Sequence, residues 1–114
     1  MKRFPVEGKG RCSAVVAGNL VYAVATDPHC AAGINEQTRN TLAELDDVLA
    51  RAGSGRAGLI QATVYLSDVS DKAVMDAVWC DWIGPEDNWP QRACVGVELD
   101  AGYLIEIVVT ARVL

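Results

Sequence analysis

Two runs of alternating apolar residues in the last quarter of the sequence constrain its fold more than any other feature. In residues 92–99 the apolar positions are Ala93, Val95, Val97 and Leu99. In residues 104–113 they are Ile105, Ile107, Val109, Ala111 and Val113. A period of two is typical of β-strands, whose side chains point alternately to opposite faces. The Asp-Ala-Gly segment between the runs is a turn signal, so the pattern predicts an antiparallel hairpin.

Matching the apolar faces of these strands determines the register of the predicted hairpin. It pairs Leu99 with Ile105, because a slip of one residue would turn a whole apolar set to the wrong face. Arg92, Cys94 and Glu106 then share the less apolar face. At roughly 3.4 Å per residue, Glu106 lies on the order of 20 Å from Arg92. One subunit is therefore not expected to bring both side chains to one small ligand, whereas two subunits meeting at open sheet faces can do so.

The N-terminal half predicts a hairpin followed by a long amphipathic helix. Val- and Ala-rich runs at 13–17 and 20–25 flank a Gly-Asn pair that favours a tight turn. The helix is expected to begin near Asn35, a good N-cap, and to end at Gly53. Its core-facing stripe consists of residues at helical spacing, namely Thr38, Leu42, Leu45, Leu49 and Ala52.

A third strand and a second helix complete the predicted set. The strand covers residues 59–67, and its apolar face comprises Ile60, Ala62, Val64 and Leu66. The helix is expected to be capped by Ser70 and stopped by the Gly-Pro pair at 84–85. Its predicted buried side comprises Val74, Ala77, Val78 and Trp82.

The predicted element order is ββαβαββ, an α+β arrangement in one domain spanning residues 1–114. Each half contains a strand-helix-strand crossover, and crossovers of the usual right hand place both helices on one face of a mixed sheet. The other sheet face then stays uncovered and carries Val, Leu and Ala side chains. Such a face is a dimer or trimer interface more often than a wet surface.

The composition indicates which classes of partner and which cellular compartment to expect. The net charge of -5 disfavours a nucleic-acid partner, because phosphate binding depends on clustered Lys and Arg. The N-terminus lacks the apolar run of a signal peptide and no stretch reaches membrane-spanning length, so we expect a cytoplasmic protein without a membrane partner. The cysteines show no C-x-x-C spacing and are expected to be free thiols; they are Cys12, Cys30, Cys80 and Cys94.

Arg92 and Glu106 are the strongest candidates for chemistry. The planar guanidinium of Arg92 can hold a carboxylate through two hydrogen bonds, and the residue lies at a strand start just after Pro90. The alternative is an ordinary surface arginine at a sheet edge. Glu106 lies in the most apolar strand, where an unpartnered carboxylate is costly. It is either a site residue or a structural, hydrogen-bonded glutamate.

Cys94, the His29-Cys30 pair and Trp89 are weaker candidates. Cys94 shares a strand face with Arg92, but the single histidine of the sequence lies in a distant loop, so a structural role is favoured over a nucleophilic one. His29 and Cys30 are adjacent and point apart without a further ligand cluster, so no metal site is predicted. Trp89 is expected to wall a pocket, and the other two tryptophans to fill the core or an interface.

Three stretches of the sequence form a recognisable set. They are Glu36-Gln-Thr-x-Asn40-Thr-Leu in the first helix, Pro90-x-Arg92-x-Cys94-Val95 and the near-terminal Ile105-Glu106-Ile107. In these and over nearly its whole length, the chain resembles the RidA/YjgF family of small enamine and imine deaminases, also called L-PSP endoribonucleases, and is most similar to the shorter YoaB-like branch. The resemblance implies a chorismate-mutase-like fold assembled as a homotrimer, with three sites in clefts between subunits.

The resemblance also implies roles for individual residues. Arg92 would bind the carboxylate of a 2-imino or 2-enamino acid, and Glu106 would orient the water that attacks the imine carbon. The backbone around Cys94 would help to shape the site. No metal or organic cofactor is implied.

The sequence departs from the family pattern in three places. Arg11 or Cys12 stands where the archetype has a tyrosine, residues 23–25 read Ala-Val-Ala in place of Thr-Ser-Gly, and Asp76 replaces an asparagine. An acid at Asp76 would repel a carboxylate substrate unless its side chain is turned away, whereas Arg11 would add attraction. The predicted substrate-binding set is therefore Arg92, Cys94, Arg11, Asp76 and Trp89.

The function suggested by these residues is hydrolysis of reactive 2-enamino or 2-imino acids to 2-oxo acids and ammonia. The alternative is a non-catalytic trimer that binds a small carboxylate or a protein partner. Ribonuclease activity is disfavoured by the negative charge.

Overall fold

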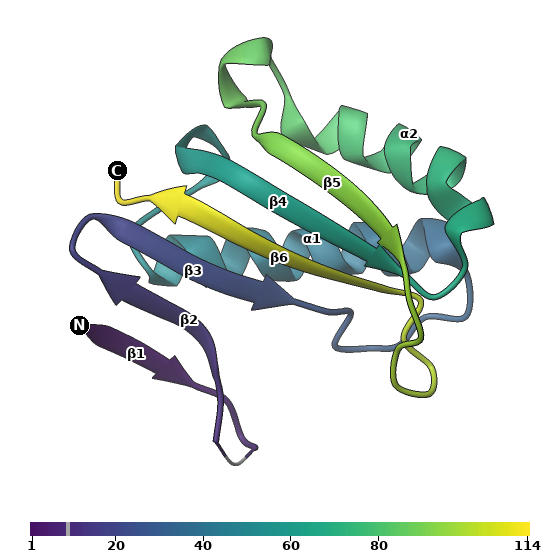
Figure 1. The fold of residues 1–114 in the computed structure, drawn as a ribbon, viewed down its shortest axis with the longest axis horizontal. Helices are drawn as coiled ribbons and strands as arrows, with labels where there is room; N and C mark the ends of the chain where they lie inside the picture. The colour runs from purple at the N-terminus through teal and green to yellow at the C-terminus, as the bar shows by residue number, and fades with distance from the viewer. Residues whose placement is uncertain (9) are drawn as a thin grey trace.

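The computed structural model describes residues 1–8 and 10–114, and within them the chain forms a six-stranded sheet and two α-helices (Figure 1). The strands are β1 (Lys2–Pro5), β2 (Cys12–Ala17), β3 (Leu20–Ala25), β4 (Leu59–Leu66), β5 (Gln91–Gly96) and β6 (Ile105–Arg112). The helices are α1 (Ile34–Arg51) and α2 (Lys72–Ile83), with 3₁₀ turns η1 (Arg56–Gly58), η2 (Val69–Asp71) and η3 (Glu86–Asn88). The strand order is β1-β2-β3-β6-β4-β5. This arrangement confirms the predicted α+β class.

The last two strands do not form the predicted hairpin. β5 pairs in parallel with β4, whereas β6 lies between β3 and β4 and is antiparallel to both (Figure 1). Residues 97–104 carry the chain from the sheet edge to its centre. This segment passes around the end of β4, where Val97 N donates to Leu66 O at 2.9 Å and Ser67 N donates to Leu104 O at 3.0 Å. The predicted pairing of Leu99 with Ile105 is therefore wrong.

The helices α1 and α2 cover one face of the mixed sheet, as predicted. In Figure 1, α1 passes behind the sheet. Alternate residues of β4 and β6 point toward this face and are buried: Ala62, Val64, Leu66, Ile105, Ile107, Val109 and Ala111. The alternation of β6 was thus correctly predicted. Because burial of apolar area is the main driving force of folding, this layer forms the core.

The opposite sheet face remains open and carries apolar side chains. Val95 and Val108 are each 39% exposed and Tyr22 is 47% exposed. The apolar alternation of β5 therefore belongs to the open face and not to the core, which explains why matching it to the buried face of β6 gave a wrong register.

Two local features of the sheet escaped prediction. β1 adds an antiparallel edge next to β2, where the short, charged Lys-Arg-Phe-Pro sequence suits an exposed edge strand. In β4, the register shifts between Leu59 and Gln61. This bulge turns Ile60 outward, where it is 46% exposed, instead of into the predicted core.

The helices begin differently from the prediction. Gly33 precedes α1, while Asn35 is already helical and its side chain accepts a hydrogen bond from Arg39 Nε at 3.0 Å. Ser70 belongs to η2, where Asp68 accepts its backbone N–H. The predicted apolar stripe of α1 is buried, in line with expectation.

The buried side of α2 differs in part from the predicted one. Val74 and Ala77 are exposed, and the residues that face the core are Met75, Val78, Trp79 and Ile83. Because nine of the twelve residues of α2 are apolar, its helical period is weak, and the predicted stripe was placed one position off for Val74 and Ala77.

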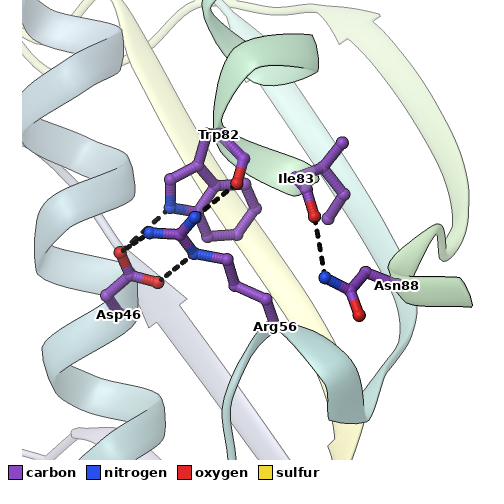
Figure 2. Close-up of polar contacts among 5 residues, drawn as sticks. All are labelled: Asp46, Arg56, Trp82, Ile83 and Asn88. Atoms are coloured by element: carbon purple, nitrogen blue, oxygen red, sulfur yellow. Dashed lines mark hydrogen bonds and ion pairs between the residues drawn. The ribbon is translucent and has the colours of Figure 1, made fainter. Parts of the chain in front are cut away.

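A polar cluster ties α1 to α2 (Figure 2). Arg56 donates to both carboxylate oxygens of Asp46, at 3.0 and 2.8 Å, and to the backbone oxygen of Trp82. Trp82 Nε1 also donates to Asp46, at 3.0 Å, and the Arg56 guanidinium lies 4.9 Å from the indole centroid. The hydrogen bonds to Asp46 raise the pKa of Arg56. The cluster is thus closed on itself and is best described as a structural clamp.

Candidate functional site

Arg92 lies on the helix-covered face of the edge strand β5. It is aligned with the buried Ala62 of β4, so its side chain reaches under α2. There Nη2 donates to Asp76 Oδ1 at 2.5 Å, and the guanidinium carbon lies 5.1 Å from the ring centroid of Trp79. The Arg92 side chain keeps 20% of its surface exposed. It is therefore held in place and still reachable from solvent.

Asp76 is turned toward Arg92 and not away from it. Its other oxygen accepts a hydrogen bond from Lys72 Nζ at 2.7 Å, one helical turn earlier on α2. Burial alone would raise the pKa of Asp76, but hydrogen bonds from Lys72 and Arg92 outweigh this and lower it. Asp76 is therefore ionised at neutral pH. We call Lys72, Asp76, Trp79 and Arg92 the Arg92 half-site.

Glu106 lies on the opposite face, toward a separate cleft. It is aligned with Tyr65 of β4 and is half-buried. The cleft has a volume of about 670 Å³, and its polar walls include Arg11, Glu44, Asp100, Tyr103 and Glu106. We call it the Glu106 cleft.

The Glu106 cleft forms where β2 parts from β3. Pairing between these strands stops at Ala14 and Ala23, while Cys12 pairs instead with Pro5 of β1. The separated ends of the strands supply part of the cleft wall, including Cys12, Ser13, Val24 and Ala25. Arg11 and Cys12, predicted at this position from the family pattern, thus lie in the same cleft as Glu106.

The structure does not place Arg92, Cys94 and Glu106 on one face. Arg92 and Cys94 are aligned with Ala62 and Val64 on the helix-covered face, whereas Glu106 is on the open face. The prediction fails because β5 and β6 both pair with β4 and not with each other. In a single chain, β4 separates the two candidate groups.

The remaining predicted residues, Cys94 and Trp89, lie in β5 or just before it. Cys94 is partly buried and packs against the core, two residues along β5 from Arg92. Trp89 precedes β5 and is 60% exposed, with its Nε1 donating to Gly84 O at 3.0 Å. Two contacts of the Arg92 half-site were not predicted: the hydrogen bond from Lys72 to Asp76 and the packing of Trp79 against Arg92. The i, i+4 spacing of Lys72 and Asp76 on α2 was the available signal.

The histidine-cysteine pair lies on the surface. His29 and Cys30 are exposed, and within residues 1–8 and 10–114 no group of three or more His, Cys, Asp or Glu is arranged to hold a metal ion. All four cysteines lie in these residues and are free, as predicted. In the described part of the chain, no helix has the length and apolar character needed to cross a bilayer.

Comparison with known proteins gives consistent matches over almost the whole chain. The family model described as Endoribonuclease L-PSP matches residues 9–113. The RutC family protein YoaB of Escherichia coli strain K12 is 34% identical over 110 residues, which cover 95% of this chain and 96% of YoaB. A RutC family protein of Haemophilus influenzae is 31% identical over 99 residues, or 84% of each protein.

A solved structure agrees with these sequence matches. The crystal structure of a YjgF family member from Neisseria meningitidis is similar to this chain with a TM-score of 0.90 and 32% identity, covering 97% of this chain and 92% of that one. The matched region therefore includes the strands and helices that carry the Arg92 half-site and the Glu106 cleft.

Proposed function

Because this chain belongs to the endoribonuclease L-PSP family, we propose that it is a cofactor-independent deaminase that hydrolyses reactive 2-enamino or 2-imino acids. The family membership confirms the resemblance drawn from the motifs around Arg92 and Glu106. The proposed products are a 2-oxo acid and ammonia. The proposal rests on two groups that one site could combine. Arg92 is held in place and partly exposed on one face of the sheet, and Glu106 lines a cleft on the other face.

The proposed site is completed by a neighbouring subunit in a homotrimer. Arg92 lies on the edge strand β5, where a second chain can approach it, and the exposed Val95 and Val108 supply apolar surface for the contact. The Arg92 half-site of one subunit would then face the Glu106 cleft of the next. A cyclic assembly makes this contact once for each subunit.

The proposed chemistry requires little more than positioning. Arg92 holds the substrate carboxylate through charge-assisted hydrogen bonds. Glu106 accepts a proton from water as the water oxygen bonds to the imine carbon, and the proton passes on to the substrate nitrogen. The hydroxyl proton of the adduct then moves to the nitrogen, the carbon-nitrogen bond breaks, ammonia leaves and the carbon becomes a carbonyl. An enamine substrate first becomes an imine by moving one proton from its nitrogen to its terminal carbon. Fixed charges and a held water lower the barrier of a reaction that already proceeds in solution.

The test is ammonia release from freshly generated 2-aminoacrylate. Replacing Arg92 with alanine is expected to reduce the enzymatic acceleration on the order of a hundredfold, because the substrate carboxylate loses its charged partner. Arg51→Ala is the matched control, since Arg51 pairs with Asp47 on the exposed side of α1 and its loss should leave activity unchanged. Full activity in Arg92→Ala would exclude the proposed carboxylate contact.

A second candidate function is binding of a small carboxylate without turnover. It is favoured by the position of Arg92 and Glu106 on opposite faces of the sheet, because a carboxylate held by Arg92 of one chain is out of reach of Glu106 of the same chain. Calorimetric binding of a 2-oxo acid, without acceleration of ammonia release from a panel of imines, would support this function over the first.

A further inference from the structure

The charges around Arg92 form a short chain that alternates in sign. Asp76 lies between Lys72 Nζ at 2.7 Å and Arg92 Nη2 at 2.5 Å. Two cations and one anion leave this half-site with a single net positive charge. The site therefore compensates one carboxylate, and a second carboxylate on the same ligand has no counter-charge within it.

Among its described residues, the Glu106 cleft carries more acids than bases, so its walls offer no net positive charge to a second carboxylate. Of the described residues that line it, Glu44, Asp100 and Glu106 are acids and Arg11 is basic. A ligand held between the half-site and the cleft would thus project its far end toward a predominantly negative wall. Like charges at short range in a partly enclosed site raise the free energy of binding.

We infer, on the basis of the proposed function, that Asp76 is a specificity-determining residue that restricts the site to substrates with one carboxylate. Dicarboxylates are disfavoured, whereas substrates with a neutral or cationic far end are accepted. Asp76 acts in two ways, since it removes one positive charge next to Arg92 and occupies one of the hydrogen-bond donors of the guanidinium.

The experiment compares a monoanionic and a dianionic probe, 2-oxobutyrate and 2-oxoglutarate, by calorimetry. Wild-type protein is expected to bind 2-oxobutyrate at least about tenfold more tightly, a ratio equivalent to about 1.4 kcal/mol. Asp76→Asn keeps the side-chain shape but removes the negative charge. It should tighten binding of both probes and of 2-oxoglutarate most, reducing the ratio on the order of tenfold.

Two further variants separate this effect from a change in stability: one that removes a positive charge instead of a negative one, and a matched control on α1. Lys72→Gln removes a cation from the exposed end of the same chain of charges and should weaken 2-oxoglutarate binding further. Asp47→Asn also breaks an exposed i, i+4 ion pair, but on α1, and should leave the ratio of affinities unchanged. Raised salt should reduce the discrimination in wild-type protein, because it screens the charges.

The outcomes distinguish this inference from the proposed function. An unchanged ratio in Asp76→Asn, with both probes bound, overturns the role of Asp76 and leaves imine hydrolysis standing. Probe binding with the expected shift in ratio, but without imine hydrolysis, supports the role of Asp76 and removes the catalytic proposal. A wild-type protein that binds neither probe overturns both.

Discussion

At the scale of single residues, Asp27 shows how a buried charge can organise a loop. Its side chain is fully buried and accepts hydrogen bonds from His29 N at 2.7 Å, Ala31 N at 2.9 Å and Asn40 Nδ2 at 3.1 Å. These contacts fold the segment between β3 and α1 against the helix. Burial alone would raise the pKa of Asp27, but the hydrogen bonds outweigh it and lower the pKa.

Replacing Asp27 with alanine should destabilise the protein by about 2–4 kcal/mol, because three donors lose their acceptor. Urea denaturation at neutral pH measures this loss. A carboxyl whose pKa is lower in the folded state contributes stability above its unfolded pKa of about 3.9, and the contribution disappears as the pH falls through the folded pKa. The difference between wild type and variant should therefore shrink below about pH 4.

The matched control for Asp27 is Asp81→Asn, which alters an exposed acid on α2. It should change the free energy of unfolding by no more than about 0.5 kcal/mol. Equal stability of Asp27→Ala and wild type at neutral pH would show that the loop does not depend on this carboxylate.

Residue types were easier to predict than residue surroundings. The motifs identified Arg92, Glu106, Arg11 and Asp76 as candidates, but a strand pattern gives only alternation and not the face that a neighbouring strand will cover. Asp27 was not predicted, because the Pro and Gly residues around it indicate only a loop. Its contact with the N–H two residues ahead is an Asx turn, a signal that the local sequence offered.

At the scale of elements, the hairpin prediction failed for an identifiable reason. Two alternating strands joined by a turn signal usually pair with each other. Here α2 connects β4 to β5 as a crossover, and a crossover requires the two strands to run parallel, as they do. The strand-helix-strand pattern of residues 59–96 favours this parallel pairing, whereas the local turn signal favours the wrong neighbour.

The Arg56 clamp between α1 and α2 has a testable energetic role. Arg56→Met should destabilise the protein by about 1–2 kcal/mol, because Asp46 loses two hydrogen bonds and the backbone carbonyl of Trp82 loses its donor. The value is modest since the side chains of Arg56 and Asp46 are 41% and 36% exposed, so solvent screens their attraction. Thermal or urea unfolding measures this loss in the free energy of unfolding.

A double-mutant cycle with Asp46→Asn isolates the pair within this clamp. Arg51→Met provides the control, because its ion pair with Asp47 is more exposed and joins residues of the same helix. An effect of Arg56→Met no larger than that of the control would mean that the clamp adds little to the packing of the helices.

At the scale of the whole molecule, the chain is a flat two-layer body. Its principal extents are 37 × 37 × 20 Å, with helices on one side of the sheet and apolar side chains exposed on the other. This layering was predictable, because crossovers of one hand place both helices together. Expectations for subunit number and for the composition of a complete site came mainly from the family resemblance, since both depend on surfaces that meet only in an assembly.

The proposed sharing of a site between subunits predicts recovery of activity when two inactive variants are mixed. Arg92→Ala and Glu106→Ala should each be inactive alone. After joint unfolding and refolding at equal amounts, random trimers should contain intact Arg92 and intact Glu106 at about a quarter of their sites. The measurement is ammonia release, compared with wild-type protein treated in the same way.

The double variant, Arg92→Ala with Glu106→Ala in one chain, is the control for this mixing experiment. Refolded with either single variant, it should restore no activity, because no site can then hold both groups. Absence of recovery in the mixture of single variants, despite mixed trimers by native mass spectrometry, would place both groups in the same subunit or remove one of them from the reaction.

The central position of β6 has a consequence for how the chain is made. The ribosome synthesises this strand after all the other strands, yet β3 and β4 depend on it as their common neighbour. Until it emerges, the nascent polypeptide exposes two unsatisfied strand edges, which are prone to association with other chains. A chain that stops before Ile105 would therefore yield aggregates or material for proteases, and not a shortened folded protein.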